Sequence, residues 1–225
     1  MRPLTDHTPK PLLQAGDKPL IMWHIERLVR AGITDLVINH AHLGAKIEQA
    51  LGDGSQFGAH IQYSAEGTAL ETAGGIAFAL PLLCAPSPLA PLSEGEGNPF
   101  AVINGDIFCD YDFARLPKLA ELMQRNHDNM HLVMVDNPPQ HPNGDFGLHD
   151  FRITDATPKL TFSGIGLYQP SLFTHIQRGT KAPLAPLLRE QIALGKVSGE
   201  HHRGVWMDIG TPQRLHELDV QLRHA

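Results

Sequence analysis

Phe100-Ala101-Val102-Ile103-Asn104-Gly105-Asp106 is the stretch of sequence that decides the fold. Its four leading apolar residues are typical of a strand that is buried on both faces, and the Gly-Asp pair ends that strand. On either side, strand-like and helix-like periodicities alternate at the lengths that βαβ crossovers need. The sequence therefore predicts an α/β fold built on a mostly parallel central sheet.

The elements expected around this strand divide at Asp136. Before it, we expect strands at 35–39, 61–64, 100–104 and 132–135, and helices at 18–31, 45–51, 72–80 and 113–124. After it, shorter β-like pieces are expected at 145–149, 161–168, 196–198 and 204–207, followed by a helix over 211–223. No linker separates the two parts, so one domain over residues 1–225 is expected. The Pro-, Ser- and Gly-rich segment 86–98 is expected to be a mobile surface insertion.

Composition excludes several classes of function. The 225 residues carry 18 Lys and Arg against 24 Asp and Glu, a net charge of −6, which argues against a nucleic acid or an anionic membrane as the main partner. No apolar run approaches the roughly 18 residues that a bilayer span needs, and no signal-peptide core follows the start. The two cysteines have neither metal-site spacing nor a disulfide framework, so a cytoplasmic location is expected.

Two acidic residues stand where strands are expected to end. Asp106 directly follows the core strand, and Asp208 lies where a short strand meets the last helix. Ligands of open α/β sheets bind beyond the carboxyl ends of the strands, and two carboxylates there can share one Mg²⁺ beside phosphates. A plain turn aspartate is the alternative for Asp106. Helix capping explains Thr211-Pro212 but not Asp208.

Two further segments can face a nucleotide. Lys10 lies between Pro9 and Pro11, which hold its backbone extended, so its ammonium group can act as a fixed charge against phosphate. An ordinary surface lysine is the alternative. Residues 66–75 turn from a strand into a helix, whose first N–H groups can bind an anion or a base edge. Gly-rich turns of this kind are common, so this signal is weak by itself.

Five motifs, in this order, resemble those of the sugar-1-phosphate nucleotidyltransferases, also called sugar nucleotide pyrophosphorylases. They are Arg2-Pro3-Leu4-Thr5 with Pro9-Lys10-Pro11-Leu12, Asn104-Gly105-Asp106, Gly144-Asp145-Phe146-Gly147, Phe162-Ser163-Gly164-Ile165, and Trp206 to Pro212. The resemblance covers nearly the whole chain. It implies a Rossmann-like three-layer sandwich of the nucleotidyltransferase type.

The resemblance also implies a reaction and roles for residues. A sugar 1-phosphate attacks the α-phosphorus of UTP, pyrophosphate leaves, and no general base is needed because the phosphate is largely dianionic near neutral pH. Mg²⁺ would be held by Asp106 and Asp208, while Lys10 and Arg2 would be the catalytic cations on the phosphates. The nucleotide-binding residues implied are Glu66, Glu71, Thr72, Gly75 and Gly105. The sugar-binding residues implied are Asn104, Asp145, Gly147, Thr161 and Gly164.

The sequence departs from the family pattern in two places. Glu71 stands where the family commonly has Gly, which favours the muramate-type uridylyltransferases of cell-wall recycling over mannose-1-phosphate guanylyltransferases. N-acetylmuramic acid 1-phosphate is therefore the expected acceptor, with glucose 1-phosphate or mannose 1-phosphate as alternatives. The family's first strand and Gly-rich loop precede the segment similar to Arg2–Thr5. We therefore expect an amino-terminally truncated, monomeric catalytic domain that lacks this strand, binds triphosphate poorly and has weak activity.

Two other functions compete with this one. Asp110-Tyr111-Asp112 has the Asp-x-Asp spelling of nucleotide-sugar-dependent glycosyltransferases, but Asp110 lies past the expected strand and Asp112 is a ready helix N-cap. A non-catalytic protein that binds sugar nucleotides is the other alternative. Release of pyrophosphate distinguishes the nucleotidyltransferase from both.

Overall fold

The computed structural model describes residues 1–84 and 97–224 of the chain. They form two compact units. Unit 1 comprises Met1–Ala69, Asn104–Ala114 and Gly204–Ala225, and unit 2 comprises Leu70–Ile103 and Arg115–Arg203. One domain over the whole chain stays a prediction. All but the last two residues of the expected insertion at 86–98 lie outside the described residues. Within the described residues, every helix is too short or too polar to cross a bilayer.

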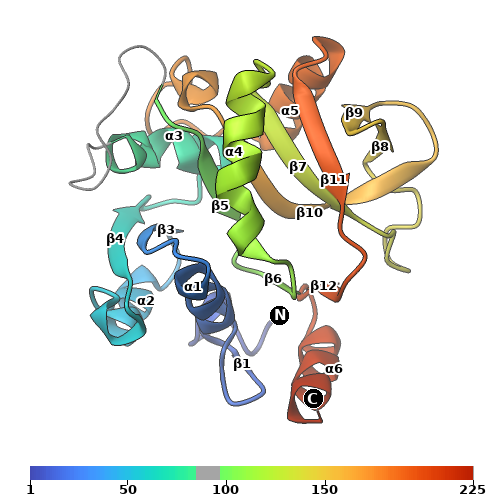
Figure 1. Ribbon diagram of the computed structural model, residues 1–225. Coiled ribbons are helices and arrows are strands. Elements are labelled where there is room, and N and C mark those ends of the chain that lie inside the picture. The colour runs from blue at the N-terminus through green and yellow to red at the C-terminus, as the bar shows by residue number, and fades with distance from the viewer. Residues whose placement is uncertain (85–96, 225) are drawn as a thin grey trace. The chain divides into compact units, whose positions relative to one another are not determined.

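Unit 1 is built from short strands and helices (Figure 1). Its elements are η1 (Lys10–Leu12), β1 (Gln14–Ala15), β2 (Lys18–Pro19), α1 (Leu20–Arg30), β3 (Asp35–His40), α2 (Gly44–Leu51), η2 (Ser55–Phe57), β4 (His60–Ala65), β6 (Ile107–Cys109), β12 (Trp206–Asp208) and α6 (Pro212–Arg223). The strands pair as β1–β2, β3–β4 and β6–β12. Because β3 and β4 are parallel, their carboxyl ends lie at the same edge.

Apolar side chains on α1 hold unit 1 together. Ile21 and Ile25 pack against Ile47 of α2 in one buried cluster. Leu20 belongs to a second cluster, which also contains Phe108 of β6. Burying a side chain of this size stabilises the fold by about 1.5–3 kcal/mol. The apolar residues whose spacing predicted a helix at 18–31 are therefore also the residues that pack α1 into unit 1.

Unit 2 contains a six-stranded sheet. Its elements are α3 (Glu71–Leu83), β5 (Phe100–Ile103), α4 (Leu116–Arg125), β7 (Met130–Val135), β8 (Phe146–His149), β9 (Arg152–Thr154), β10 (Lys159–Tyr168), η4 (Pro170–Phe173), α5 (Leu184–Ala193) and β11 (Val197–His201), and η3 (Phe113–Arg115) crosses the boundary between the units. The strand order is β5-β10-β7-β11-β9-β8.

The α/β class is confirmed, but the sheet of unit 2 is mixed rather than mostly parallel. β7 and β11 are parallel, whereas β10 runs antiparallel to both β5 and β7. The β8–β9 hairpin adds another antiparallel pair. The tight turn between β8 and β9 makes that pair antiparallel, because such a turn can join only antiparallel neighbours.

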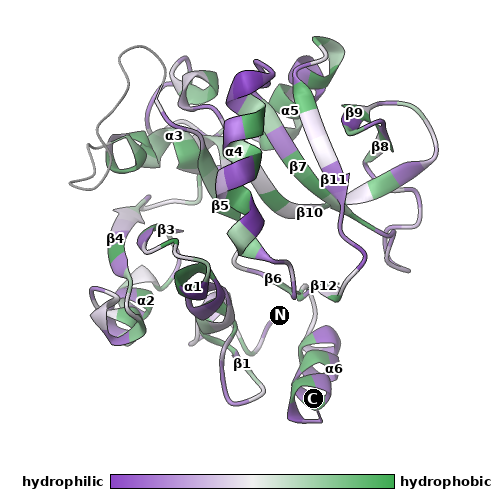
Figure 2. Cartoon of the chain, viewed as in Figure 1, coloured by the Kyte–Doolittle hydropathy of each residue, from purple (hydrophilic) through white to green (hydrophobic). Residues whose placement is uncertain are grey.

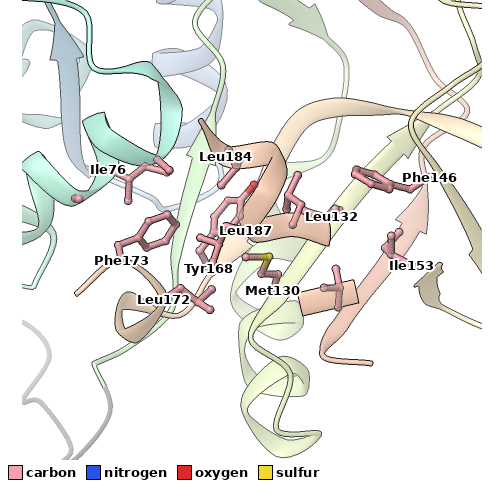
Figure 3. Close-up of a cluster of buried hydrophobic side chains, with 14 of the residues drawn as sticks. Ile76, Met130, Leu132, Phe146, Ile153, Tyr168, Leu172, Phe173, Leu184 and Leu187 are labelled. Carbon is pink, nitrogen blue, oxygen red and sulfur yellow. The ribbon is translucent and has the colours of Figure 1, made fainter. Parts of the chain in front are cut away.

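The sheet of unit 2 separates two helical layers. Met130, Leu132 and Met134 alternate along β7 and are completely buried in a cluster with side chains of α3 and α5 (Figure 3). The intervening side chains of β7 point to the opposite face. Figure 1 shows α4 in front of the sheet and α5 behind it. Hydrophobic and hydrophilic residues alternate along α4, as a helix with one solvated side requires (Figure 2).

Candidate active site

Asp106 and Asp208, the two predicted metal ligands, lie on neighbouring segments of unit 1. β6 begins directly after Asp106, and β12 ends at Asp208, which is opposite Ile107 in the antiparallel pair. The backbone N–H of Ile209 donates to the carbonyl oxygen of Asp106 over 2.9 Å. Two acids that are far apart in the sequence thus lie on, or directly before, neighbouring strands of one antiparallel pair, and their sharing of one metal ion stays a prediction.

Lys10 is an ion-pair partner of Asp106. Its Nζ donates to Oδ2 of Asp106 over 2.8 Å, and the two side chains are 23% and 47% exposed. Lys10 opens η1, where Leu13 N–H donates to the Lys10 carbonyl oxygen over 3.1 Å. The expected extended backbone at Lys10 is wrong, because Lys10 is the first residue of a 3-10 helix, although the prolines on either side still restrict its backbone. The Lys10 side chain is therefore fixed by its ion pair with Asp106 rather than free on the surface.

Arg214 is the corresponding partner of Asp208. Its Nη1 donates to Oδ2 of Asp208 over 2.5 Å, and its Nε donates to Oγ1 of Thr211 over 3.3 Å. The same Oγ1 accepts the backbone N–H of Arg214, so Thr211 is the N-cap of α6. Thr211-Pro212 has the capping role that its sequence predicted, and it also anchors the arginine.

The chemistry of this donor set fits a magnesium ion. Among the described residues, no group of three or more His, Cys, Asp or Glu side chains could hold a metal by itself. Mg²⁺ usually binds proteins through one or two carboxylates and takes its other ligands from substrate phosphates and water. Asp106 and Asp208 supply two carboxylates, and each now carries a cationic side chain on one oxygen. They would hold Mg²⁺ together with a nucleotide rather than alone.

A buried histidine of α1, His24, contacts the backbone of β6. Nε2 of His24, on α1, lies 2.7 Å from the carbonyl oxygen of Ile107. A carbonyl oxygen only accepts, so Nε2 carries the proton in this hydrogen bond. Burial lowers the pKa of His24 to about 4, although the hydrogen bond to Ile107 acts in the opposite direction. His24 therefore fixes β6 without adding charge next to Asp106.

Two other predicted residues of unit 1 lie elsewhere. The Arg2 side chain is 90% exposed and pairs with Asp6 over 3.4 Å, not with a predicted metal ligand. Glu66 follows β4 at the carboxyl edge of the β3–β4 pair, where its Oε1 accepts from Nδ2 of Asn39 over 3.1 Å. That edge is where ligands of α/β folds bind. The nucleotide-binding role of Glu66 and the catalytic role of Arg2 stay predictions.

In unit 2, the start of α3 contains the other predicted nucleotide-binding residues. Glu71 has a left-handed backbone (φ 60°) and pairs with Lys181 over 3.0 Å. Thr72 is exposed and Gly75 is buried. The N–H of Gly74 donates to the carbonyl oxygen of Ala182 over 3.0 Å. One donor of this helix start is thus used inside the protein, so any ligand would have to use the others.

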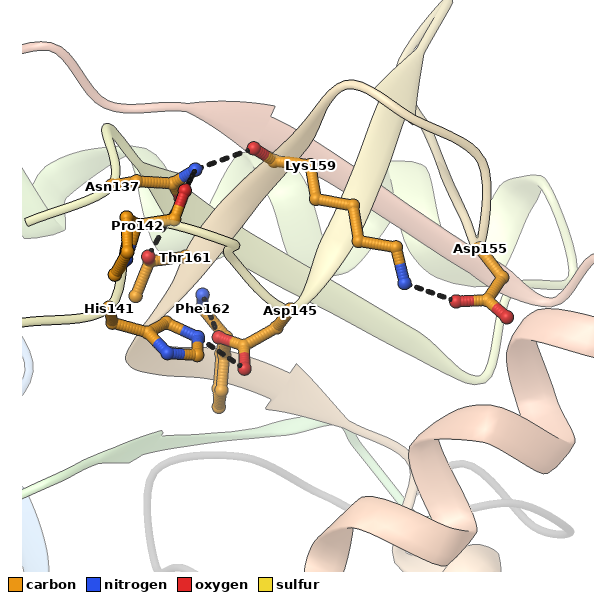
Figure 4. Close-up of polar contacts among 8 residues, drawn as sticks. All are labelled: Asn137, His141, Pro142, Asp145, Asp155, Lys159, Thr161 and Phe162. Atoms are coloured by element: carbon orange, nitrogen blue, oxygen red, sulfur yellow. Dashed lines mark hydrogen bonds and ion pairs between the residues drawn. The ribbon is translucent and has the colours of Figure 1, made fainter.

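The predicted sugar-binding side chains of unit 2 already have partners (Figure 4). Oδ2 of Asp145 accepts the backbone N–H of Phe162 over 2.8 Å, and its Oδ1 lies 3.0 Å from Nε2 of His141. The hydroxyl of Thr161 is buried and donates to Oδ1 of Asn137 over 2.9 Å. These bonds fasten the loop 137–145 to β10. The residues thus shape a loop, and contact with a sugar stays a prediction.

Glycines in the predicted motifs have different structural reasons. A Cβ on Gly147 would lie 2.2 Å from the carbonyl oxygen of Ala156, so packing alone requires glycine there. Gly164 has φ 83° at the irregularity of β10 between Phe162 and Ile165. A Cβ on Gly105 would meet only Pro11, at an ordinary 3.8 Å. Packing therefore leaves room for a ligand at Gly105 but not at Gly147.

In the Asp-x-Asp spelling at 110–112, the second carboxylate is used in a local turn. Oδ1 of Asp112 accepts the N–H of Ala114 over 3.1 Å at the start of η3. Tyr111 is buried, and the N–H of Asp110 donates to the carbonyl oxygen of Val205 over 3.0 Å. Asp112 is the N-cap that the sequence suggested, which removes the main support for a glycosyltransferase.

Three residues around these sites were not predicted from the sequence: Asn137, His141 and Arg214. Asn137 has a sequence signal, since it comes directly after a strand and an acidic residue. Arg214 follows Thr211 by three residues, so it lies one helical turn from the cap. No pattern in the sequence around Arg214 indicates that Arg214 binds Asp208.

Comparison with known proteins gives one family match and several similar chains. A family model described as nucleotidyl transferase matches residues 1–224. The chain is 48% identical to the N-acetylmuramate alpha-1-phosphate uridylyltransferase of Neisseria meningitidis serogroup B, over 98% of this chain and 92% of that protein. It is 31% identical to the mannose-1-phosphate guanyltransferase of Emericella nidulans, over 95% of this chain but 58% of that protein.

Solved structures share the fold at low sequence identity. A protein described as a glucose-1-phosphate thymidylyltransferase of Bacillus anthracis, in complex with sucrose, has a TM-score of 0.80 at 20% identity, covering 100% of this chain and 91% of that chain. An apo UDP-glucose pyrophosphorylase has a TM-score of 0.72 at 17% identity, covering 98% of this chain and 92% of the other. The expected type of α/β fold is confirmed.

Proposed function

We propose that this chain, which belongs to the nucleotidyl transferase family, transfers a uridylyl group from UTP to N-acetylmuramic acid 1-phosphate. The products are the UDP-sugar and pyrophosphate. The observation that carries the proposal is the β6–β12 pair, which joins Asp106 and Asp208 in one ribbon with Lys10 on the first of them. The similarity to the meningococcal uridylyltransferase supports the choice of nucleotide and sugar.

Lys10 supplies charge for this reaction. An oxygen of the sugar 1-phosphate attacks the α-phosphorus of UTP, the bond to the β,γ-diphosphate breaks, and pyrophosphate leaves with the electron pair. The attacking phosphate needs no base, because its second pKa is about 6. The Lys10 ammonium group, which now contacts Asp106, stabilises phosphate oxygens as negative charge moves between them.

Asp106 and Asp208 would hold the divalent cation. When bound, Mg²⁺ acts as a Lewis acid on phosphate oxygens and aligns them for in-line displacement. The protein's own contribution is positioning, since two carboxylates on adjacent segments are fixed by backbone hydrogen bonds before any ligand arrives. Arg2 is proposed as a second phosphate-binding cation.

Other residues would recognise the base and the sugar. We assign Glu66, Glu71, Thr72, Gly75 and Gly105 to the nucleotide. The sugar is assigned to Asn104, Asp145, Gly147, Thr161 and Gly164. A reaction of this kind serves cell-wall recycling in the cytoplasm. The 31% identity to a mannose-1-phosphate guanyltransferase makes guanylyl transfer to mannose 1-phosphate the second candidate.

A substrate panel tests the proposal. The protein is incubated with Mg²⁺ and each pair of UTP, dTTP or GTP with muramic, glucose or mannose 1-phosphate, and released pyrophosphate is measured. We expect the highest kcat/KM with UTP and N-acetylmuramic acid 1-phosphate. A clear preference for glucose 1-phosphate would remove the sugar assignment, and a preference for GTP with mannose 1-phosphate would establish the second candidate. Binding without pyrophosphate release would contradict the enzyme itself.

A further inference from the structure

Arg214 is held by more contacts than an ordinary surface arginine. Its guanidinium group donates to Asp208 through Nη1 and to Thr211 through Nε, and its side chain is 21% exposed. These two bonds use different nitrogens of one planar fork, so they fix its orientation as well as its position. The bond to Asp208 joins the start of α6 to the end of β12.

Gly210 makes room for this arrangement. A Cβ at Gly210 would lie 2.5 Å from Nη2 of Arg214 and 3.3 Å from Oδ1 of Asp208. The guanidinium group therefore lies next to the backbone of Gly210, where there is no side chain, between Asp208 and Thr211. Any larger residue at 210 would have to displace the guanidinium group from this position.

Arg223, on the same helix, shows what an ordinary pair looks like. It pairs with Asp219 one turn away and donates to the carbonyl oxygen of Gly16 over 3.2 Å, and its side chain is 61% exposed. Exposed pairs of this kind contribute about 0–1 kcal/mol and have no consequence for a ligand. Arg214 differs because its partner is a predicted metal ligand and because its own side chain is only 21% exposed. In the described part of the chain, Oδ2 of Asp208 is occupied by Arg214, and no hydrogen bond to Oδ1 is found.

We propose that Arg214 is a positioning residue that holds Asp208 through Oδ2 and leaves Oδ1 for the divalent cation. This inference rests on the proposed function, which assigns Asp208 to the metal. Groups that hydrogen-bond a metal ligand typically change metal affinity by about 10–100-fold when they are removed. The positive charge of Arg214 opposes the cation, so positioning and charge predict opposite signs for its removal.

Mn²⁺ binding distinguishes these two effects. We would titrate Mn²⁺ into the protein with UTP present and no sugar phosphate, and measure bound ion by electron paramagnetic resonance. Arg214→Met removes both the donor and the charge, whereas Arg214→Lys keeps a donor and the charge but loses the fork. Arg223→Met is the matched control on α6. Circular dichroism verifies that every variant is folded at the temperature of the titration.

Positioning predicts that Arg214→Met binds Mn²⁺ about tenfold more weakly than the wild type. Arg214→Lys should lie between the two, and Arg223→Met should bind as the wild type does. In turnover, the apparent KM for Mg²⁺ should rise for Arg214→Met while kcat at saturating Mg²⁺ changes less.

Unchanged or tighter Mn²⁺ binding by Arg214→Met would overturn the inference and leave the proposed function intact. A wild-type protein that binds no Mn²⁺ beside UTP would overturn both the inference and the metal assignment. A wild type that binds Mn²⁺ but releases no pyrophosphate would contradict the proposed reaction alone.

Discussion

Lys10 and Arg214 each donate to Oδ2 of one of the two predicted metal ligands. The charges of Asp106 and Asp208 are thereby balanced within unit 1 before any ligand binds. Both carboxylates are partly exposed, so each pair contributes only about 0–1 kcal/mol to stability. The importance of these pairs is for charge placement rather than for folding.

Alanine at Gly74 and alanine at Gly105 should differ in their effect on the free energy of unfolding. A Cβ on Gly74 would lie 2.5 Å from the carbonyl oxygen of Thr180, so we expect Gly74→Ala to lower the free energy of unfolding by about 1–3 kcal/mol. Gly105→Ala should change it by less than about 0.5 kcal/mol, because Pro11 is at ordinary contact distance. Urea denaturation measures both. A Gly74→Ala protein as stable as the wild type would refute the packing argument.

Protonation of His24 should destabilise the folded protein in acid. Burial lowers its pKa from 6.5 to about 4, so between these pH values the unfolded chain binds a proton that the folded protein does not. The stability present above pH 6.5 is therefore lost as the pH falls toward 4, by about 3 kcal/mol.

His24→Gln removes this titration and keeps a donor within reach of the Ile107 carbonyl oxygen. Urea denaturation between pH 4 and 7 should give a smaller loss of stability on acidification for the variant than for the wild type. Equal pH dependence of the two proteins would show that His24 is not the group responsible.

At the scale of elements, the turn from β12 into α6 connects the predicted site to the core. Thr211 caps α6, and Leu215 and Leu218 of the helix are buried in the cluster that contains Phe108. The same short segment thus carries Asp208 on one side and core contacts on the other. Stability of the helix start and geometry of the carboxylate are therefore linked.

Removing the cap hydroxyl should weaken α6. We expect Thr211→Ala to lower the free energy of unfolding by about 1 kcal/mol, since the N–H of Arg214 loses its acceptor. Thr211→Ser keeps the hydroxyl and should stay close to the wild type. Thermal and urea unfolding of the two variants test this. If they are equally stable, the cap does not contribute as argued.

Strong periodicity predicted several elements well. β3 and α6 lie within one or two residues of their expected ranges. β6 was missed because three residues after a Gly-Asp turn carry too little pattern, and its partner β12 is remote in the sequence. α5 was also missed, although Leu184, Leu187 and Leu188 have helical spacing after Pro183.

The candidate site was predictable only in part. The expected strand ends predicted that Asp106 and Asp208 lie near each other, but the contact that joins their segments is the β6–β12 pair, and β6 was not predicted. The partner of Asp208 depends on the direction in which α6 leaves β12. The bond between Thr161 and Asn137 likewise depends on how a loop folds back on β10. Such contacts come from tertiary structure and have no local signature.

At the scale of the whole molecule, the two units contain different parts of the predicted machinery. Unit 1 carries Asp106, Asp208 and Lys10, and unit 2 carries the loop around Asp145 and the start of α3. The family read from five motifs is confirmed by the match over residues 1–224.

The most direct test follows the α-phosphorus of UTP. The protein is given Mg²⁺, N-acetylmuramic acid 1-phosphate and UTP labelled at that atom, alongside Asp106→Asn, Asp208→Asn and a sample with EDTA. We predict that the label moves into the UDP-sugar with the wild type, and that the rate falls at least about 100-fold in each variant and in EDTA. Transfer of the label by either variant at the wild-type rate would contradict the account.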